Sequence, residues 1–334
     1  MDPIELTRRL AAADSPSGAE EPAVAVMEEI LREAGWPVQR QTVTPGRDNL
    51  YAFREPPRLV FSTHLDTVPP YVPLREDDQW LYGRGVCDAK GIAAAMLCAA
   101  EELAQRGERR IGLLFLVGEE TGSDGARAAL ALTPKGDVII NGEPTESRLV
   151  TGSKGALHVR LAATGRAAHS AYPDEGRSAI LALLDSLNRI RELPLPVDPI
   201  LGPATLNIGM IDGGVAENVI PPMAQARLFY RTVGDTQALR QAVRAALAPE
   251  VEAEFGVEIP PYTGHGVAGW ESTVVSYTSD LPTLSPTWGR GYMLGPGSIR
   301  VAHTADERIS KAELVEAVTR YVRLAGELLV GETD

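Results

Sequence analysis

Apolar residues in the first third of the chain follow two alternating patterns, one typical of helices and the other of buried strands. Recurrence at three- and four-residue spacing predicts helices over residues 4–13, 20–34 and 91–105. Short β-like runs predict the strands, over residues 38–43, 49–53, 59–61, 111–117 and 138–140. Strands that are apolar on both faces and alternate with helices are typical of a largely parallel sheet covered on two sides. We therefore predict an α/β fold for this region.

The pattern changes near residue 155 and returns to its first form after Trp270. Between these points the order is strand, helix, strand, strand, helix, strand, which is typical of a small α+β sandwich with helices on one face. The pattern gives ranges for three of the four strands, 158–163, 204–211 and 224–231, and for both helices, 177–191 and 236–247. A strand at 273–277 and a helix at 311–329 follow. We therefore predict a discontinuous first domain, residues 1–154 and 267–334, interrupted by an inserted α+β domain, residues 155–266.

Composition narrows the classes of partner. The 334 residues include 32 Lys+Arg and 45 Asp+Glu, which gives a formal net charge of −13. This charge argues against binding to nucleic acid or to an anionic membrane, since both need a basic surface. No apolar run approaches the roughly 20 residues of a membrane-spanning helix, and the N-terminus lacks the pattern of a signal peptide. Cys87 and Cys98 are too few for a disulfide framework. We therefore expect a cytoplasmic protein.

Histidine and acidic residues stand where several predicted core strands end. Each has an ordinary explanation: Asp88 could cap the helix that follows it, and a pair such as Glu119-Glu120 is expected by chance in an acidic chain. Their positions carry more information, because α/β sheets bind ligands at the carboxyl ends of their strands. Two histidines and three or four carboxylates form the donor set of a dinuclear zinc site. The two histidines are His64 and His303, and the carboxylates would come from the five acidic candidates Asp66, Asp88, Glu119, Glu120 and Glu143.

The motifs around these residues are jointly specific, although each is weak by itself. In chain order they read H-x-D-T-V-P, G-R-G-x-x-D-x-K-G, G-E-E, G-E-P-T and A-H-T-x-D-E. No G-x-S-x-G elbow, Walker A loop, H-E-x-x-H or C-x-x-C occurs. Over nearly its whole length the chain resembles the dinuclear zinc aminoacylase, carboxypeptidase-G and desuccinylase family of peptidases and deacylases. The resemblance implies a catalytic domain interrupted by a smaller domain that serves as a lid or for dimerisation.

The same resemblance assigns metal-binding roles. It implies that Asp88 bridges two zinc ions, for which cobalt could substitute, and that the peptide bond after Asp88 is cis. His64 and Glu143 would complete one metal site, and Glu120 and His303 would complete the other. Two cations held in this way would acidify a water molecule and polarise an amide carbonyl.

Catalytic and substrate-binding roles also follow from the resemblance. Glu119 would be the general base, taking a proton from the attacking water and passing it to the leaving amine, and Asp66 would orient the imidazole of His64. In the inserted domain, His169 of G-R-A-A-H-S would reach the active site of the partner in a homodimer. Asn218 would face the substrate, and Arg231 would pair with the substrate α-carboxylate.

Within the family, the chain most resembles acetylornithine deacetylases, which belong to amino-acid (arginine) biosynthesis. We therefore predict hydrolysis of the amide bond of a small N-acyl amino acid, with N-acetylornithine as the first candidate. A succinyl-diaminopimelate desuccinylase, a carrier-linked lysine hydrolase and a dipeptidase remain open. An inactive relative that binds amino-acid derivatives is the alternative from another class. A pure binding protein would not require Glu119, which is present.

Overall fold

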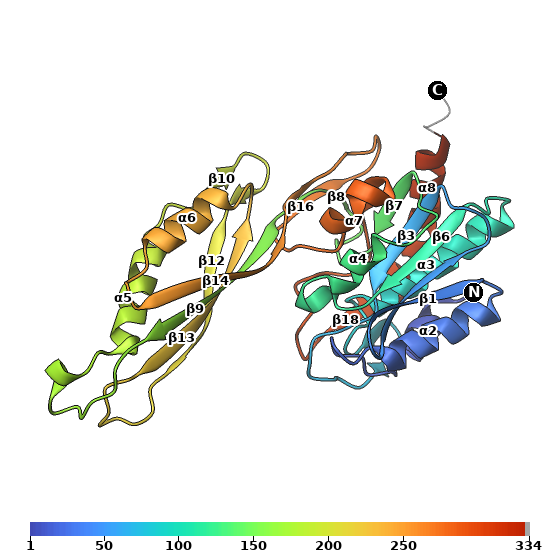
Figure 1. The fold of residues 1–334 in the computed structure, drawn as a ribbon. Helices are drawn as coiled ribbons and strands as arrows, with labels where there is room; N and C mark the ends of the chain where they lie inside the picture. The colour runs from blue at the N-terminus through green and yellow to red at the C-terminus, as the bar shows by residue number, and fades with distance from the viewer. Residues whose placement is uncertain (331–334) are drawn as a thin grey trace. The chain divides into compact units, whose positions relative to one another are not determined.

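The structure is a computed structural model that describes residues 1–330. The chain divides into two compact units, which are described separately (Figure 1). Unit 1 comprises Met1–Thr151, Gly264–Thr273 and the chain from Ser279 onward, and unit 2 comprises Gly152–Thr263 and Val274–Thr278. The predicted insertion at 155–266 begins and ends a few residues later than the main segment of unit 2, and it omits the short return of the chain at 274–278.

A six-stranded sheet forms the centre of unit 1. Its strands, in spatial order, are β1 (Val38–Thr44), β2 (Arg47–Phe53), β6 (Ile111–Leu116), β3 (Leu59–His64), β7 (Val138–Asn141) and β17 (Arg290–Met293). Strands β6, β3, β7 and β17 are parallel, and β1 and β2 add an antiparallel edge. Every residue of β3, β6 and β7 is buried, as expected for strands covered on both faces. The predicted α/β class with a largely parallel sheet is therefore confirmed.

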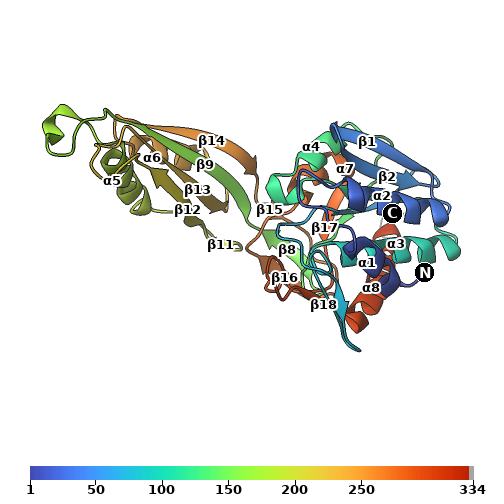
Figure 2. The same ribbon diagram turned by 90° about the horizontal axis from the view of Figure 1, so that it is seen from below.

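Helices cover both faces of this sheet (Figure 2). One face packs against α1 (Pro3–Ala11), α2 (Glu21–Glu33), α3 (Lys90–Gln105) and α8 (Lys311–Val330), and the other against α4 (Asp124–Ala129) and α7 (Leu281–Trp288). The Ala-rich α3 is buried from Lys90 to Ala100 and packs against α1 and α8. The sequence analysis missed α7 and β17. Pro282 and Pro286 lie within α7 and conceal its helical character, since proline is unfavourable inside helices.

A small three-stranded sheet in unit 1 links two loops that carry site candidates. Its strands are β4 (Arg75–Glu76), β5 (Trp80–Tyr82) and β18 (Arg308–Ser310). β5 lies shortly before Asp88 and β18 shortly after His303, and the two strands pair antiparallel. This pairing brings the segments around Asp88 and His303 together, although they are far apart in the chain.

Unit 2 contains an antiparallel sheet with helices on one face. Its strands, in spatial order, are β12 (Thr205–Gly213), β13 (Met223–Thr232), β9 (Gly155–Thr164) and β14 (Val251–Ile259). Alternate residues of β13, such as Leu228 and Tyr230, are buried against α5 (Ala179–Arg191) and α6 (Gln237–Ala245). This arrangement has the α+β pattern expected from the sequence. A hairpin of β10 (Val197–Asp198) and β11 (Gly202–Pro203) and the short η2 (Pro173–Glu175) complete the unit.

Three further strands lie where the chain passes from one unit to the other. They are β8 (Leu149–Ser153), β15 (Tyr262–Thr263) and β16 (Ser272–Val275), and they form a separate sheet. Among residues 1–330, no helix combines the length and the apolar character that crossing a bilayer requires. Cys87 and Cys98 are both buried free thiols.

Candidate metal centre

The site candidates of unit 1 meet at the carboxyl ends of its parallel strands. His64 is the last residue of β3. Glu119 and Glu120 begin η1 (Glu119–Thr121), which starts three residues after the last residue of β6. Glu143 lies two residues beyond β7. Because β6, β3 and β7 are parallel neighbours, their carboxyl ends lie at the same edge of the sheet. The adjacency of these three strands thus brings residues of three separate sequence motifs together in one cluster.

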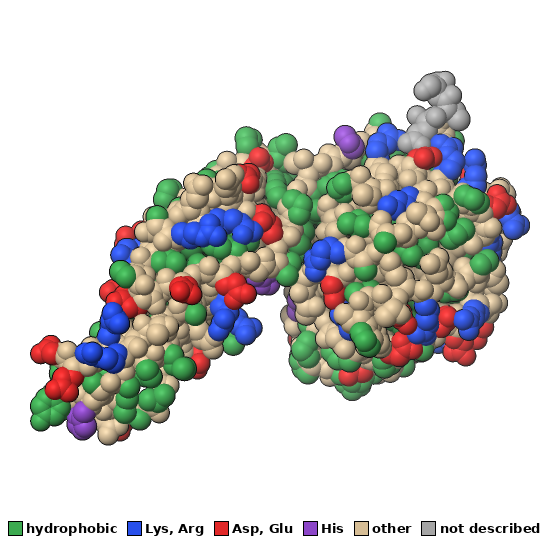
Figure 3. Space-filling view, in the orientation of Figure 1, with side chains coloured by type: hydrophobic (Ala, Val, Ile, Leu, Met, Phe, Trp, Pro, Cys, Tyr) green, Lys and Arg blue, Asp and Glu red, His purple; other side chains and the backbone are tan. Residues whose placement is uncertain are grey.

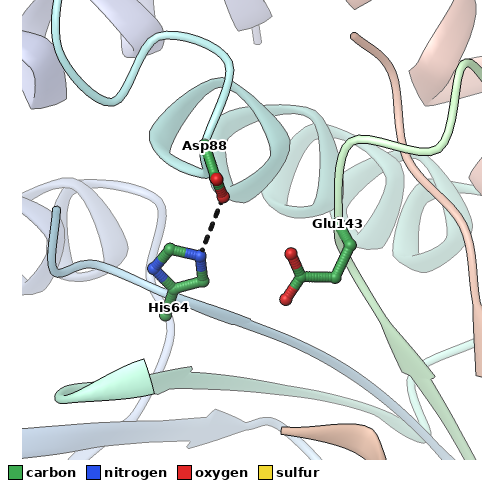
Figure 4. A group of neighbouring side chains, drawn as sticks. All are labelled: His64, Asp88 and Glu143. Atoms are coloured by element: carbon green, nitrogen blue, oxygen red, sulfur yellow. Dashed lines mark hydrogen bonds and ion pairs between the residues drawn. The ribbon is translucent and has the colours of Figure 1, made fainter. Parts of the chain in front are cut away.

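His64, Asp88 and Glu143 form the first group of possible ligands. One donor atom from each lies within 4.8 Å of the others, and all three residues are buried. His64 Nε2 lies 3.1 Å from Asp88 Oδ1, while the Glu143 carboxylate points toward both (Figure 4). Glu143 Oε1 is buried and has no hydrogen-bond partner within the described part of the chain. A buried carboxylate oxygen without a partner is unfavourable unless it binds something.

Asp88, Glu120 and His303 form the second group. Their donor atoms also lie within 4.8 Å of one another. His303 Nε2 is 2.9 Å from Glu120 Oε1 and 3.4 Å from Asp88 Oδ2. The two carboxylate oxygens of Asp88 therefore face different histidines, with Oδ1 toward His64 and Oδ2 toward His303. The peptide bond from Asp88 to Ala89 is cis, as the resemblance implied.

The donor set fits two divalent cations. Imidazole nitrogen and carboxylate oxygen are ordinary zinc ligands, and each group supplies one histidine and two carboxylates. Burial raises the pKa of Glu143 well above its usual range and raises that of Glu120. Hydrogen bonds to Asp88 and Glu120 raise the pKa of His303 to about 10. The cluster thus favours bound positive charge, which metal ions supply when they displace the protons.

Asp66 joins the end of β3 to the η1 turn. Its carboxylate accepts hydrogen bonds from the backbone N–H groups of Glu119 and Glu120, both at 3.1 Å, and from Ser17 Oγ at 2.7 Å. The ring of His64 lies beside it, with Nδ1 3.5 Å from Asp66 Oδ1 and 2.9 Å from the Asp66 carbonyl oxygen. Burial alone would lower the pKa of His64, but the carboxylates of Asp66 and Asp88 outweigh it and raise that pKa.

Glu119 stands beside the ligand groups without belonging to either. Burial, followed by the charge of Glu143, raises the pKa of Glu119 well above its usual range. The turn that presents it begins at Gly118, which has φ 75°. A Cβ atom at Gly118 would collide with the Asp124 carboxylate, so this turn requires glycine.

Four residues of unit 1 contact or surround the site but had no role in the sequence analysis. They are Ser17, Arg84, Asp280 and Glu307. Burial raises the pKa of Asp280 to about 7, although the neighbouring hydroxyl of Ser123 acts in the opposite direction. Arg84 and Glu307 stand inside the G-R-G and A-H-T-x-D-E motifs, so their motif positions were the available signal. Nothing local distinguishes Ser17 or Asp280 from ordinary loop residues.

The other three candidates, His169, Asn218 and Arg231, belong to unit 2. His169 and Asn218 are exposed and lie on two loops that pair through the bridge between His169 and Val219. The Ser170 N–H donates to the Asn218 carbonyl oxygen at 3.0 Å. Arg231 lies on β13, with its guanidinium 4.6 Å from the centre of the Phe229 ring. These two loops and β13 present the candidates on a different unit from the metal-ligand groups.

Comparison with known proteins places these motifs in a family. Residues 60–327 match the model described as peptidase family M20/M25/M40. A peptidase M20 domain-containing protein of Schizosaccharomyces pombe is 35% identical over 96% of this chain and 83% of its own length. A protein of Aspergillus oryzae named as a probable carboxypeptidase is 40% identical over 85% of this chain and 76% of its own length.

Solved structures share the fold at low sequence identity. A tripeptidase from Staphylococcus aureus superposes with a TM-score of 0.79 at 21% identity, covering 96% of both chains. A metallo-carboxypeptidase from Sulfolobus solfataricus gives 0.76 at 18% identity, covering 96% of this chain and 98% of that one. A dinuclear metal binding peptidase from Bacillus subtilis gives 0.69 at 15% identity, covering 99% and 98%. These likenesses establish a common architecture.

Proposed function

This chain belongs to peptidase family M20/M25/M40, and on that premise we propose that it hydrolyses the amide bond of a small N-acyl amino acid or short peptide using two metal ions. Membership of this family makes the chain a hydrolase of metallopeptidase type. The observation that carries the proposal is the position of Asp88, whose two carboxylate oxygens face His64 and His303 in separate ligand groups. A carboxylate between two such groups has the arrangement of a bridging ligand.

We assign the metal ligands accordingly. His64 and Glu143 would hold one ion, Glu120 and His303 the other, and Asp88 both. When bound, two zinc ions, or cobalt in their place, would lower the pKa of a water molecule and polarise the substrate carbonyl. Asp88 is already suited to a cation, because hydrogen bonds from the two histidines outweigh its burial and hold its pKa below the usual range.

Glu119 is the proposed general base. A carboxylate with a raised pKa is better matched to proton transfer near neutral pH than an ordinary glutamate. It would accept the proton of the attacking water and donate it to the departing amine, so that the carboxylate is restored. The Asp66 carboxylate accepts a hydrogen bond from the Glu119 backbone N–H at 3.1 Å and lies 3.5 Å from His64 Nδ1. Asp66 would therefore fix the position of this base relative to His64.

Unit 2 supplies the proposed substrate contacts. Arg231 would pair with a free α-carboxylate of the substrate through two parallel hydrogen bonds, and the fungal relatives named as probable carboxypeptidases favour a substrate of this kind. Asn218 would face the same substrate, and His169 would donate a hydrogen bond to the developing oxyanion. N-acetylornithine remains the first candidate on the motif resemblance, and short peptides are the second because of those relatives.

The test is amine release from a panel with matched amide bonds. It contains N-acetylornithine, N-succinyl-diaminopimelate, other N-acetyl amino acids and dipeptides, each assayed with added zinc or cobalt and again with a chelator. We expect turnover that the chelator abolishes and that zinc restores. A preference for acetylornithine would support the biosynthetic assignment, and a preference for dipeptides would support the peptidase assignment. No turnover on any substrate, with metal demonstrably bound, would favour a binding protein instead.

We also propose that the chain forms a homodimer through unit 2. β12 is an edge strand, which offers unpaired backbone groups to a second chain. Met210 and Ile211 on β12 are 58% and 56% exposed, and Leu181 on the adjoining α5 is 63% exposed. Figure 3 shows apolar side chains gathered along the lower edge of this unit. Such residues are unfavourable in water unless a partner covers them.

Light scattering checks the dimer directly. Leu181→Arg together with Met210→Lys should give a monomer, whereas Val315→Lys, a control at an exposed apolar residue of unit 1, should leave the mass unchanged. If His169 acts on the partner, mixing inactive His169→Ala and Glu119→Gln homodimers should restore part of the activity. Absence of complementation despite demonstrated subunit exchange would contradict this role of His169.

A further inference from the structure

The carboxylate of Glu307 is buried inside the loop that carries Asp88. Glu307 is only 1% exposed. Its Oε1 accepts hydrogen bonds from three backbone N–H groups of that loop. These belong to Gly85, at 2.8 Å, and to Cys87 and Asp88, both at 3.2 Å. A carboxylate that accepts several backbone N–H groups is an effective anchor, because each bond is charge-assisted. Glu307 therefore holds the backbone of Asp88 directly.

Arg84 completes this arrangement from the other side of the loop. Its Nη1 lies 2.6 Å from Glu307 Oε2, and the guanidinium is almost fully buried. The same side chain donates to the Thr304 carbonyl oxygen at 3.4 Å and to the Pro70 carbonyl oxygen at 3.3 Å. Thr304 is the neighbour of His303, so Arg84 contacts the His303 loop as well as Glu307.

The two residues therefore link the loops of two proposed metal ligands. Glu307 stands four positions after His303 and hydrogen-bonds to the N–H of Asp88, while its own carbonyl oxygen accepts from the Gly83 N–H at 3.0 Å. The register of β5 and β18 continues this connection at Tyr82 and Arg308. Neither Asp88 nor His303 lies in a strand that pairs with the other. The contacts of Glu307 and Arg84, together with the pairing of β5 and β18, therefore determine the separation of Asp88 and His303.

The attraction between Arg84 and Glu307 does not by itself explain a buried ion pair at this place. Removing two charges from water is costly, and well-packed apolar residues of similar size often stabilise a protein equally well. An apolar replacement for Glu307 would leave the N–H groups of Gly85, Cys87 and Asp88 without this acceptor. What the charged pair supplies is orientation of the loop that presents Asp88.

We propose that Glu307, held by Arg84, is a positioning residue that sets Asp88 against His303 and thereby determines the affinity of the Asp88, Glu120 and His303 group for its metal ion. This inference rests on the proposed metal site and extends it to residues that bind no metal. Supporting groups around metal ligands typically change metal affinity by about 10- to 100-fold when they are replaced.

The experiment measures metal binding rather than turnover. Metal-free wild type, Glu307→Gln and the control Glu101→Gln are titrated with zinc against a chromophoric chelator, and their cobalt absorption spectra are recorded. Glu101 forms a partly buried ion pair with Arg54 at 2.6 Å in unit 1 and lies near the C-terminal end of α3, whose first turn follows Asp88. We expect Glu307→Gln to weaken the binding of one of the two zinc ions by roughly 10- to 100-fold and to alter the cobalt absorption spectrum of the protein. Glu101→Gln should bind both ions as tightly as wild type does.

A third variant separates positioning from loss of folding. Arg84→Lys keeps the positive charge but has one nitrogen in place of the two that contact the Pro70 carbonyl and Glu307, so it should weaken binding of the same ion by a smaller factor. If Glu307→Gln does not fold, Arg84→Lys carries the test alone. Zinc affinities equal to wild type in the folded variants would overturn the inference. Failure of wild type itself to bind two ions would instead overturn the proposed function.

Discussion

The two sheets of this protein distribute their side chains in opposite ways. In unit 1, β3, β6 and β7 are buried along their whole length, so polar chemistry is confined to the points where the strands end. In unit 2, β13 alternates between buried residues beneath the helices and more exposed residues on the opposite face. The first arrangement concentrates charge at one edge, and the second spreads it over a surface.

This difference has consequences for electrostatics. The acidic cluster at the edge of the unit 1 sheet lies in a buried environment, and burial raises the pKa of Glu119, Glu120 and Glu143. On the polar face of unit 2, Arg231 stacks on Phe229, whose ring lies 4.7 Å from that of His158. Burial, and then the charge of Arg231, lower the pKa of His158. These environments agree with the proposed roles, in which unit 1 carries the metal ligands and the base and unit 2 carries the substrate contacts.

The largest expected effect separates the two units by kinetics. Glu119→Gln removes the proposed base and should lower kcat by about 10²- to 10⁴-fold while leaving zinc content unchanged. Arg231→Lys keeps the charge but loses bidentate pairing, and should mainly raise KM, by roughly 10- to 100-fold. Steady-state kinetics with metal analysis distinguishes the two. Unchanged turnover in Glu119→Gln would contradict the proposed mechanism.

The next effect concerns the two cores. Phe61 on β3 is fully buried and makes an edge contact with Tyr321, so Phe61→Ala should destabilise unit 1 by about 3–5 kcal/mol. Leu228 on β13 is 2% exposed, and Leu228→Ala should destabilise unit 2 by about 2–5 kcal/mol. Hydrogen exchange followed by peptide mass analysis reports each unit separately. If either substitution increased hydrogen exchange equally in both units, the two units would unfold together.

Metal removal should act on unit 1 alone. A ligand present at 100 times its Kd stabilises the folded state by about 2.7 kcal/mol. A chelator should therefore increase hydrogen exchange in the loops around Asp88, Glu120 and His303 and leave α5 and β13 of unit 2 unchanged. Increased exchange in unit 2 of the same magnitude would place metal-linked stability outside the proposed site.

The effect expected to be most gradual is the pH dependence of metal binding. In the metal-free protein His303 has a pKa of about 10 and those of Glu120 and Glu143 are raised, so these groups retain protons that a cation must displace. Affinity should therefore fall as pH falls, by about tenfold per pH unit for each proton displaced. Zinc titrations between pH 8 and 6 measure this slope. An affinity independent of pH would mean that these ligands are already deprotonated.

Several features of the fold could be predicted because the relevant forces act locally. Continuous apolar runs identified β3, β6 and β7, and strand-like runs at 158–163 and 224–231 identified β9 and β13. Strands β17 and β18 and helix α7 could not be found in this way. They are short or contain proline, and pairing with distant strands or packing on the sheet decides their conformation.

The amino-acid sequence by itself determined which donors this protein carries and in what order, because residue type and position relative to a strand end are local properties. It also indicated the α/β class, since the period of apolar residues reflects which faces of a segment are buried. The separation of the donors was decided by the tertiary structure alone. The two oxygens of Asp88 face different histidines, and Glu307 holds the Asp88 backbone, because strands far apart in the chain pair in one register. No local pattern encodes that register, since it results from the packing of the whole unit.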